Sequence, residues 1–165
     1  MTRYLTVTIL ILLLCSYAAA QQGERFFVMA SAGWGPETGA RGEGSVGIRV
    51  TENVYGLTTM NAAGGVGAVV QDLLSKLATT RGVTLWGRAG AGATTTNLTD
   101  TTNYGLTFGG GVMMSYDLAN ISGKLRGLEA VVSAKAMYVP YSADGVSVTT
   151  VVRPQYFGGL KWNWD

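Results

Sequence analysis

The chain has 165 residues, a net charge of +2 at pH 7, 24 glycines and only 13% charged residues. Soluble domains normally have about a quarter of their residues charged, so this composition predicts a surface partly covered by something other than water. The basic residues are scattered singly, which argues against nucleic acid as a partner.

Residues 1–20 are predicted to be a cleavable secretory signal peptide. Arg3 gives the positive start, an apolar run follows up to Cys15, and the small residues 18–20 precede Gln21. The run is too short to span a bilayer as a helix. A retained anchor and a lipoprotein cut before Cys15 are the alternatives. Residues 21–165 would then form a single domain.

The remaining chain is a series of segments about ten residues long, many of them alternating in polarity, which is typical of a transmembrane β-barrel. The alternation is clearest over 104–116, where large apolar residues share one parity and small or polar residues the other. The predicted strands are 24–35, 43–51, 53–62, 65–77, 81–94, 104–118, 126–138 and 148–164. The polar segments 36–42, 93–103 and 139–147 are predicted to be outward connections.

Two segments fit this pattern less well. Within residues 66–78, apolar residues recur at helical spacing, which leaves an amphipathic helix open as the alternative. A strand is favoured there because single-chain bacterial barrels normally have an even number of strands. Pro154 cannot donate to a strand ladder, so we expect it at an edge or a bulge, with the residues before it extending the last hairpin.

Charged side chains on the polar parity of the strands are predicted to point into the barrel. They are Arg49, Arg88, Glu129, Lys135, Arg153 and Lys161. An eight-stranded barrel has an interior just wide enough for side chains, and buried charges must pair. Glu129 is the predicted acceptor for Arg88 or Lys135, and Asp72 joins them if its segment is a strand. This pattern predicts a structural plug. A gated pore or an interior ligand site is the alternative, and the basic surplus would favour an anion.

Aromatic residues cluster near the segment ends, where a membrane barrel places two girdles at the lipid headgroups. The predicted interface residues are Trp34, Tyr104, Tyr116, Tyr138, Tyr156, Trp162 and Trp164, together with Tyr55 and Trp86. Trp86 shares the parity of Arg88, so an inward position is open for it.

The signal peptide, the alternating segments, the aromatic ends and the closing run 156–164 resemble the eight-stranded outer-membrane barrel families, which include the membrane domain of outer membrane protein A. The resemblance implies an antiparallel up-and-down transmembrane β-barrel. It also implies the outer membrane of a Gram-negative bacterium, reached by signal-peptide-dependent export. The run 156–164 is similar to the C-terminal signal read by the barrel assembly machinery, although Asp165 follows the last aromatic. The implied partners are that machinery and outer-membrane lipid, with any partner of the extracellular loops unidentified.

The expected function is a structural or surface-interaction role without catalysis. The chain has no histidine and its single cysteine is Cys15, so after residue 20 it lacks the groups of a Ser/His/Asp triad, a Cys/His pair or the common zinc sites. We therefore expect no enzyme activity and no cofactor. The alternatives are a soluble lipocalin-like carrier of an apolar ligand and a narrow pore. The carrier would place Phe108, Val112 and Met114 inside the barrel, and the membrane protein would place them outside.

Overall fold

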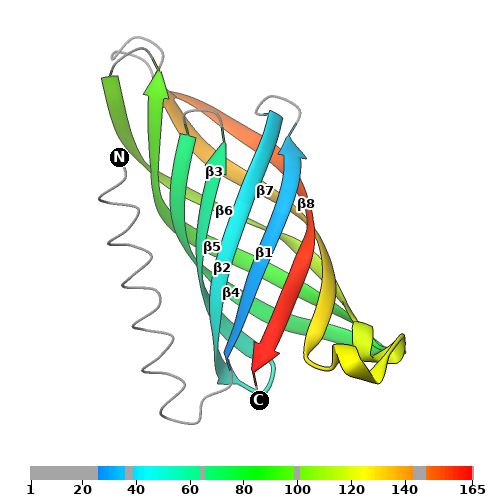
Figure 1. Ribbon diagram of the computed structural model, residues 1–165. Helices are drawn as coiled ribbons and strands as arrows, with labels where there is room; N and C mark the ends of the chain where they lie inside the picture. Colours follow the sequence, from blue (N-terminus) through cyan, green and yellow to red (C-terminus); the bar gives the residue numbers. More distant parts are fainter. Residues whose placement is uncertain (1–25, 36–38, 64–65, 99–100, 143–147, 165) are drawn as a thin grey trace.

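The computed structural model in Figure 1 describes residues 26–35, 39–63, 66–98, 101–142 and 148–164. The predicted signal peptide, residues 1–20, lies outside the described residues. Within the described part of the chain, no helix is long and apolar enough to cross a membrane.

Eight strands form a closed barrel in which each strand pairs antiparallel with its neighbours in sequence and β1 closes the barrel against β8. The strands are β1 (Phe26–Gly35), β2 (Gly39–Thr51), β3 (Val54–Ala63), β4 (Val66–Thr80), β5 (Val83–Leu98), β6 (Thr101–Asp117), β7 (Leu128–Ser142) and β8 (Val148–Trp164). Two short 3-10 turns, η1 (Leu118–Asn120) and η2 (Gly123–Leu125), lie between β6 and β7. The predicted up-and-down eight-stranded β-barrel is confirmed.

The alternation on β6 decides which face of the sheet is inside. Leu106 and Phe108 are 78% and 55% exposed, and the intervening Thr107 is 2% exposed. Further along the strand Val112 and Met114 are also exposed. The large apolar parity therefore faces outward. The carrier alternative placed these side chains in the cavity and is wrong on this point.

Residues 66–80 form strand β4, as the even strand count predicted. The helical spacing arises because apolar residues come in consecutive pairs, one on each face of the sheet. Val69 and Leu73 are exposed on the outer face, whereas Val70 and Leu74 are buried inside. The register with β5 shifts between Lys76 and Ala78, which marks a bulge near the end of the strand.

Several strands continue into segments that the sequence predicted as loops. Strand β2 begins at Gly39, β5 runs to Leu98, β6 begins at Thr101 and β7 extends to Ser142, so the predicted connections 36–42, 93–103 and 139–147 are too long. Threonine explains much of the error over 93–103. Its β-branched side chain favours strands even where the sequence is polar.

Three connections of the barrel lie within the described residues, all at one end. Residues 52–53, 81–82 and 118–127 lie at the end where β1 begins and β8 finishes, the lower end in Figure 1, which we call the turn end. The opposite end is called the loop end. Arg81 and Gly82 both have positive φ, 46° and 81°, as a two-residue hairpin turn matching the strand twist requires.

Pro154 lies at a local edge, as expected from its missing N–H. It is opposite Ala136 of β7, whereas the ladder of β8 with β1 reaches only as far as Tyr156. The residues before Pro154 pair with β7 and extend the last hairpin beyond β1.

Candidate functional site: the charged interior and the outer surface

Four charged side chains from β2, β4, β5 and β7 meet inside the barrel, and we call them the central charge cluster: Glu43, Asp72, Arg88 and Lys135. All four are buried. Arg88 reaches two carboxylates with separate nitrogens, since Nη1 donates to Glu43 Oε1 at 2.7 Å and Nη2 to Asp72 Oδ2 at 2.6 Å. Lys135 Nζ donates to the other oxygen of Glu43. One carboxylate thus pairs with two cations.

Hydroxyl groups extend the cluster around Asp72. Arg88 Nη2 lies 2.7 Å from Thr59 Oγ1, and the Thr59 hydroxyl donates to Asp72 Oδ2 at 2.8 Å. Ser45 lies 3.0 Å from the same hydroxyl. Among the described residues, Arg88 Nε has no hydrogen-bond partner. The four charges of the cluster are therefore all paired, as buried charges need to be, and only the N–H at Arg88 Nε lacks an acceptor among the described residues.

A second ion pair lies nearer the turn end. Lys161 Nζ donates to Glu129 Oε1 at 3.0 Å, and Asn163 Nδ2 donates to the same oxygen at 2.6 Å. Lys161 also lies 4.8 Å from the ring centre of Phe27 and 5.0 Å from that of Trp86. Lys161 is 2% exposed, so its ammonium group contacts Glu129 and the two aromatic faces in place of bulk water.

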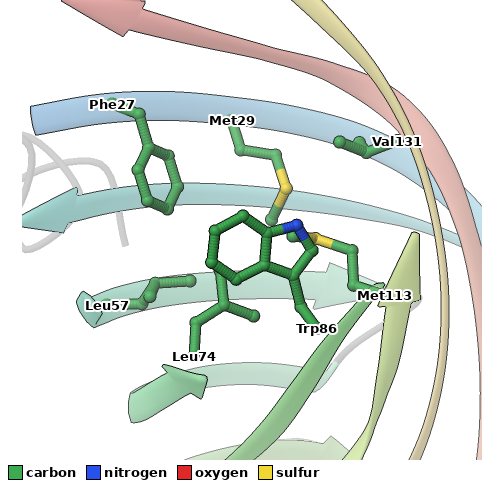
Figure 2. Close-up of a cluster of buried hydrophobic side chains, with 7 residues drawn as sticks. All are labelled: Phe27, Met29, Leu57, Leu74, Trp86, Met113 and Val131. Carbon is green, nitrogen blue, oxygen red and sulfur yellow. The ribbon is translucent and has the colours of Figure 1, made fainter. Parts of the chain in front are cut away.

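An apolar cluster adjoins both charged groups. Figure 2 shows it gathered around the Trp86 indole, with side chains from β1, β3, β4, β5, β6 and β7: Phe27, Met29, Leu57, Leu74, Trp86, Met113 and Val131. Leu74 is the cross-strand partner of Arg88, and Lys161 contacts Phe27 and Trp86. The indole N–H is satisfied by Ser115 Oγ at 3.0 Å, so the ring lies inside the barrel without an unpaired donor.

Nearer the loop end the interior is polar. Arg41 Nη1 donates to Asn61 Oδ1 at 3.5 Å, and Asn61 Nδ2 donates to Gln155 Oε1 at 3.4 Å. These side chains and Lys135, together with the apolar Ala68, Val70 and Met137, line a cavity of about 20 Å³. That volume suits a single water molecule.

The structure places the predicted interior charges in different surroundings. Arg88, Lys135 and Lys161 are buried, and Glu129 is partly buried. Arg49 is half-exposed at the turn end, where its Nε donates to the Thr51 carbonyl at 3.2 Å. The side chain of Arg153 lies outside the described residues.

The predicted pairing of Glu129 with Arg88 or Lys135 is wrong, because Glu129 pairs with Lys161 and the acceptor for the other two is Glu43. The predicted participation of Asp72 is confirmed. The sequence analysis missed Glu43 and Arg41. Both share the parity of Ser45. Glu43 lies at the start of the predicted strand 43–51, so its inward position could have been inferred from that parity, whereas Arg41 lies in the segment 36–42 that was predicted as a connection.

The aromatic residues on the outer face form two groups. Near the loop end, Trp34 is paired opposite Tyr156 and Phe108 stacks on Tyr138 with 4.4 Å between ring centres. Near the turn end, Trp164 stacks on Phe26 at 4.8 Å and on Trp162 at 5.3 Å, and Tyr116 on β6 is half-exposed.

Tyr104, Tyr55 and Trp86 were also predicted to be interface residues. The side chain of Tyr104 lies outside the described residues. Tyr55 packs against the apolar cluster, edge-on to Phe27 and Trp86, and so does not belong to an outer girdle as predicted. Trp86 is 5% exposed and points inward, as its shared parity with Arg88 indicated.

A polar hollow of about 330 Å³ opens at the turn end, lined by residues that include Lys76, Asp117, Arg126, Glu129 and Lys161. Within the described residues no group of three or more metal-ligating side chains comes together. The hollow therefore offers charged and aromatic contacts and no metal centre among the described side chains.

No protein-family model and no curated protein matches this sequence. Solved structures do match. The N-terminal β-barrel domain of Pseudomonas aeruginosa OprF is 13% identical with a TM-score of 0.63, covering 85% of this chain and 97% of that one.

Two further barrels are similar. A de novo designed transmembrane β-barrel is 11% identical with a TM-score of 0.55, covering 85% of this chain and 95% of that one. Neisserial surface protein A, NspA, is also 11% identical, with a TM-score of 0.54, and the match covers 86% of this chain and 96% of that chain. At these identities the likeness concerns the fold, and this chain has the closed eight-stranded fold of small outer-membrane β-barrels.

Proposed function

We propose that this protein is an integral outer-membrane β-barrel with a structural or surface-interaction role, non-catalytic, and plugged by its own interior side chains. The observation that carries the proposal is the outward position of the large apolar side chains. Val112, Met114 and Val132 are about half-exposed, and Leu106 is exposed to a greater extent. Monomeric soluble proteins rarely present a continuous apolar surface of this kind, which bilayer lipid would cover.

The aromatic girdles support the same placement. On β8, Tyr156 and Trp162 are separated by about 20 Å of strand at roughly 3.4 Å per residue. Both are more than half exposed, and Leu160 lies exposed between them. An apolar band bordered on each side by amphipathic rings is the arrangement that transmembrane barrels present to lipid.

The packing of the interior supports a plug. Phe27, Leu57, Leu74, Met113 and Lys161 are among the largest fully buried side chains, and they come from five different strands. A carrier would need an apolar cavity, whereas the described interior holds two ion-paired groups. A pore would need a wet path past both the ion pairs and the apolar cluster.

The absence of histidine from the chain supports a non-catalytic role, since the base of the common hydrolytic triads is missing. With the turn end facing the periplasm, the loop end would face the surroundings of the cell and supply any surface contact. The alternating aromatic run of β8 supports assembly through the barrel assembly machinery, after export directed by residues 1–20.

Cell fractionation tests the proposal. The expressed chain should be recovered with the outer membrane, resist extraction by carbonate, and migrate faster on a denaturing gel when unheated than after boiling. This mobility shift is expected because a closed barrel stays folded in cold dodecyl sulfate. Recovery as a soluble periplasmic protein without the shift would overturn the membrane placement.

A further inference from the structure

The connection between β6 and β7, residues 118–127, differs from the other two connections at the turn end, each of which has two residues. Its fold is fixed by short-range hydrogen bonds. Asp117 Oδ1 accepts from the Ala119 N–H at 2.9 Å, and the Leu118 carbonyl accepts from Ile121 N at 3.0 Å. We call this segment the β6–β7 connection.

Hydrogen bonds to the neighbouring hairpin and to β8 hold the β6–β7 connection against the barrel. At its start, Asp117 N donates to the Gly82 carbonyl at 3.0 Å. At its end, the Gly127 carbonyl accepts from Asn163 N of β8 at 2.8 Å. In Figure 1 the connection, drawn in yellow, lies to the side of the lower end of the barrel. The connection is thus tied to the barrel at both of its ends.

The β6–β7 connection exposes apolar and basic side chains together. Ile121 is 69% exposed and Leu125 is 36% exposed. Lys124 and Arg126 are exposed as well, and neither forms an ion pair within the described part of the chain. Apolar side chains next to free cations are the composition of segments that lie at a membrane interface.

The turn end as a whole is basic. Its exposed or half-exposed charged side chains are Arg49, Lys76, Arg81, Lys124 and Arg126 against Glu52, Asp117 and Glu129, the last of which pairs with Lys161. The carboxylate of Asp117 is already engaged by the Ala119 N–H. A surface with this charge attracts anionic phosphate groups.

The β6–β7 connection is also continuous with the outer apolar surface. It leads directly into Leu128, which is opposite Trp162 of the turn-end aromatic group, and Trp162 stacks on Trp164. The β6–β7 connection therefore borders the turn-end aromatic group.

We propose that the β6–β7 connection is a membrane-interface anchor. Ile121 and Leu125 insert among the lipids of the leaflet at the turn end, and Lys124 and Arg126 bind the phosphate groups of anionic phospholipid headgroups. The proposal rests on the proposed membrane function, because the anchor needs a bilayer around the barrel.

Site-directed fluorophores test the anchor. Cys15 is the only cysteine of the chain and lies in the predicted signal peptide, so C15S leaves no native thiol whether or not that segment is cleaved. In this background I121C, V132C and N53C are each labelled with an environment-sensitive dye and placed in vesicles of phosphatidylethanolamine and phosphatidylglycerol. Quenching by shallow spin-labelled lipid should be about threefold stronger for I121C than for N53C, because an anchoring side chain lies ~5–10 Å below the surface. Asn53 is the matched aqueous control in an exposed turn at the same end.

The outcomes separate the two proposals. If V132C on the outer wall is not quenched by deeply placed spin labels, the membrane function itself fails. If V132C is quenched but I121C behaves like N53C, the anchor is overturned and the membrane function stands.

The cations are tested in the I121C background. K124Q together with R126Q should reduce the shallow quenching of I121C about twofold in anionic vesicles and leave it unchanged in vesicles of phosphatidylcholine alone, since each basic residue near an anionic surface adds a salt-screened attraction. K76Q, a basic residue at the same end but outside the connection, is the control and should have no effect. Equal quenching with and without Lys124 and Arg126 in anionic vesicles would overturn the headgroup contact.

Discussion

Glu43 is the residue on which the central charge cluster depends most, because it pairs with both Arg88 and Lys135. Replacing it with glutamine leaves Lys135 without an ion pair in the described interior and Arg88 with Asp72 alone. We predict that E43Q lowers the free energy of unfolding by about 3–5 kcal/mol, the usual cost of removing one partner from a buried ion pair. Urea unfolding in phospholipid vesicles, followed by tryptophan fluorescence, measures the change.

The control for this prediction is E52Q, which removes the same charge from an exposed turn. Its effect should stay within about 0.5 kcal/mol, as for most surface substitutions. Equal unfolding midpoints for the two variants would show that the ion pairs of Glu43 are not needed for stability.

Glycine has two different roles at two positions of the wall. At Gly92 a Cβ atom would collide with the backbone of β4 at Val69, whereas a Cβ at Gly42 would meet nothing within 4 Å. We predict that G92A destabilises the barrel by about 1–3 kcal/mol through overpacking. G42A should be neutral or stabilising by up to about 1 kcal/mol, because alanine has fewer unfolded conformations. The same unfolding assay decides, and a loss in G42A as large as in G92A would contradict the prediction.

At the scale of strands, β6 was predictable and the ends of β5 were not. The parity of Leu106, Phe108 and Val112 fixes which face is outside because strand periodicity is strictly two. Strand β5, by contrast, continues through the polar, threonine-rich residues 94–98, which were predicted to belong to a connection. Polarity indicates contact with water, and a hairpin whose two faces are polar can still form paired strands.

The interior partners were harder to predict than the strands. Glu43 is separated by 45 residues from Arg88 and by 92 from Lys135, on strands that are not adjacent. Which inward residues meet across a barrel depends on the tilt and stagger of the strands. The alternation along a strand shows which side chains point inward, but it does not give the tilt or the stagger of the strands. Glu129 was therefore assigned the wrong partners.

Strand β4 offers a test of the outer surface. Leu73 is 59% exposed in the middle of the strand, and we predict that L73R destabilises the barrel in vesicles by about 2–4 kcal/mol, as for a cation near the bilayer midplane. T80R places the same residue in an exposed position at the end of the strand, where the cost should fall to about 0–1 kcal/mol. Equal unfolding free energies for the two variants would argue that lipid does not cover this face.

For the molecule as a whole, the two faces of the barrel wall carry different kinds of side chain. The interior combines ion pairs with the apolar cluster around Trp86, whereas the exterior is apolar between two aromatic groups. Ions can be solvated by a polar network, but an apolar layer excludes them. In the proposed plug, the apolar cluster is therefore the part that blocks conduction.

Single-channel recording in a planar bilayer tests this blockage. The wild-type barrel should give no steady current, and W86A should give measurable openings because it removes the indole around which Phe27, Leu57 and Met113 gather. W162A removes the same side chain from the outer face and should remain silent. A buried Trp→Ala change costs about 3–5 kcal/mol, which is enough to threaten folding. The heat-dependent gel shift is therefore used to check that each variant is folded before recording. Steady current through the wild-type barrel would instead favour a narrow pore, and a silent W86A would locate the blockage at the central charge cluster.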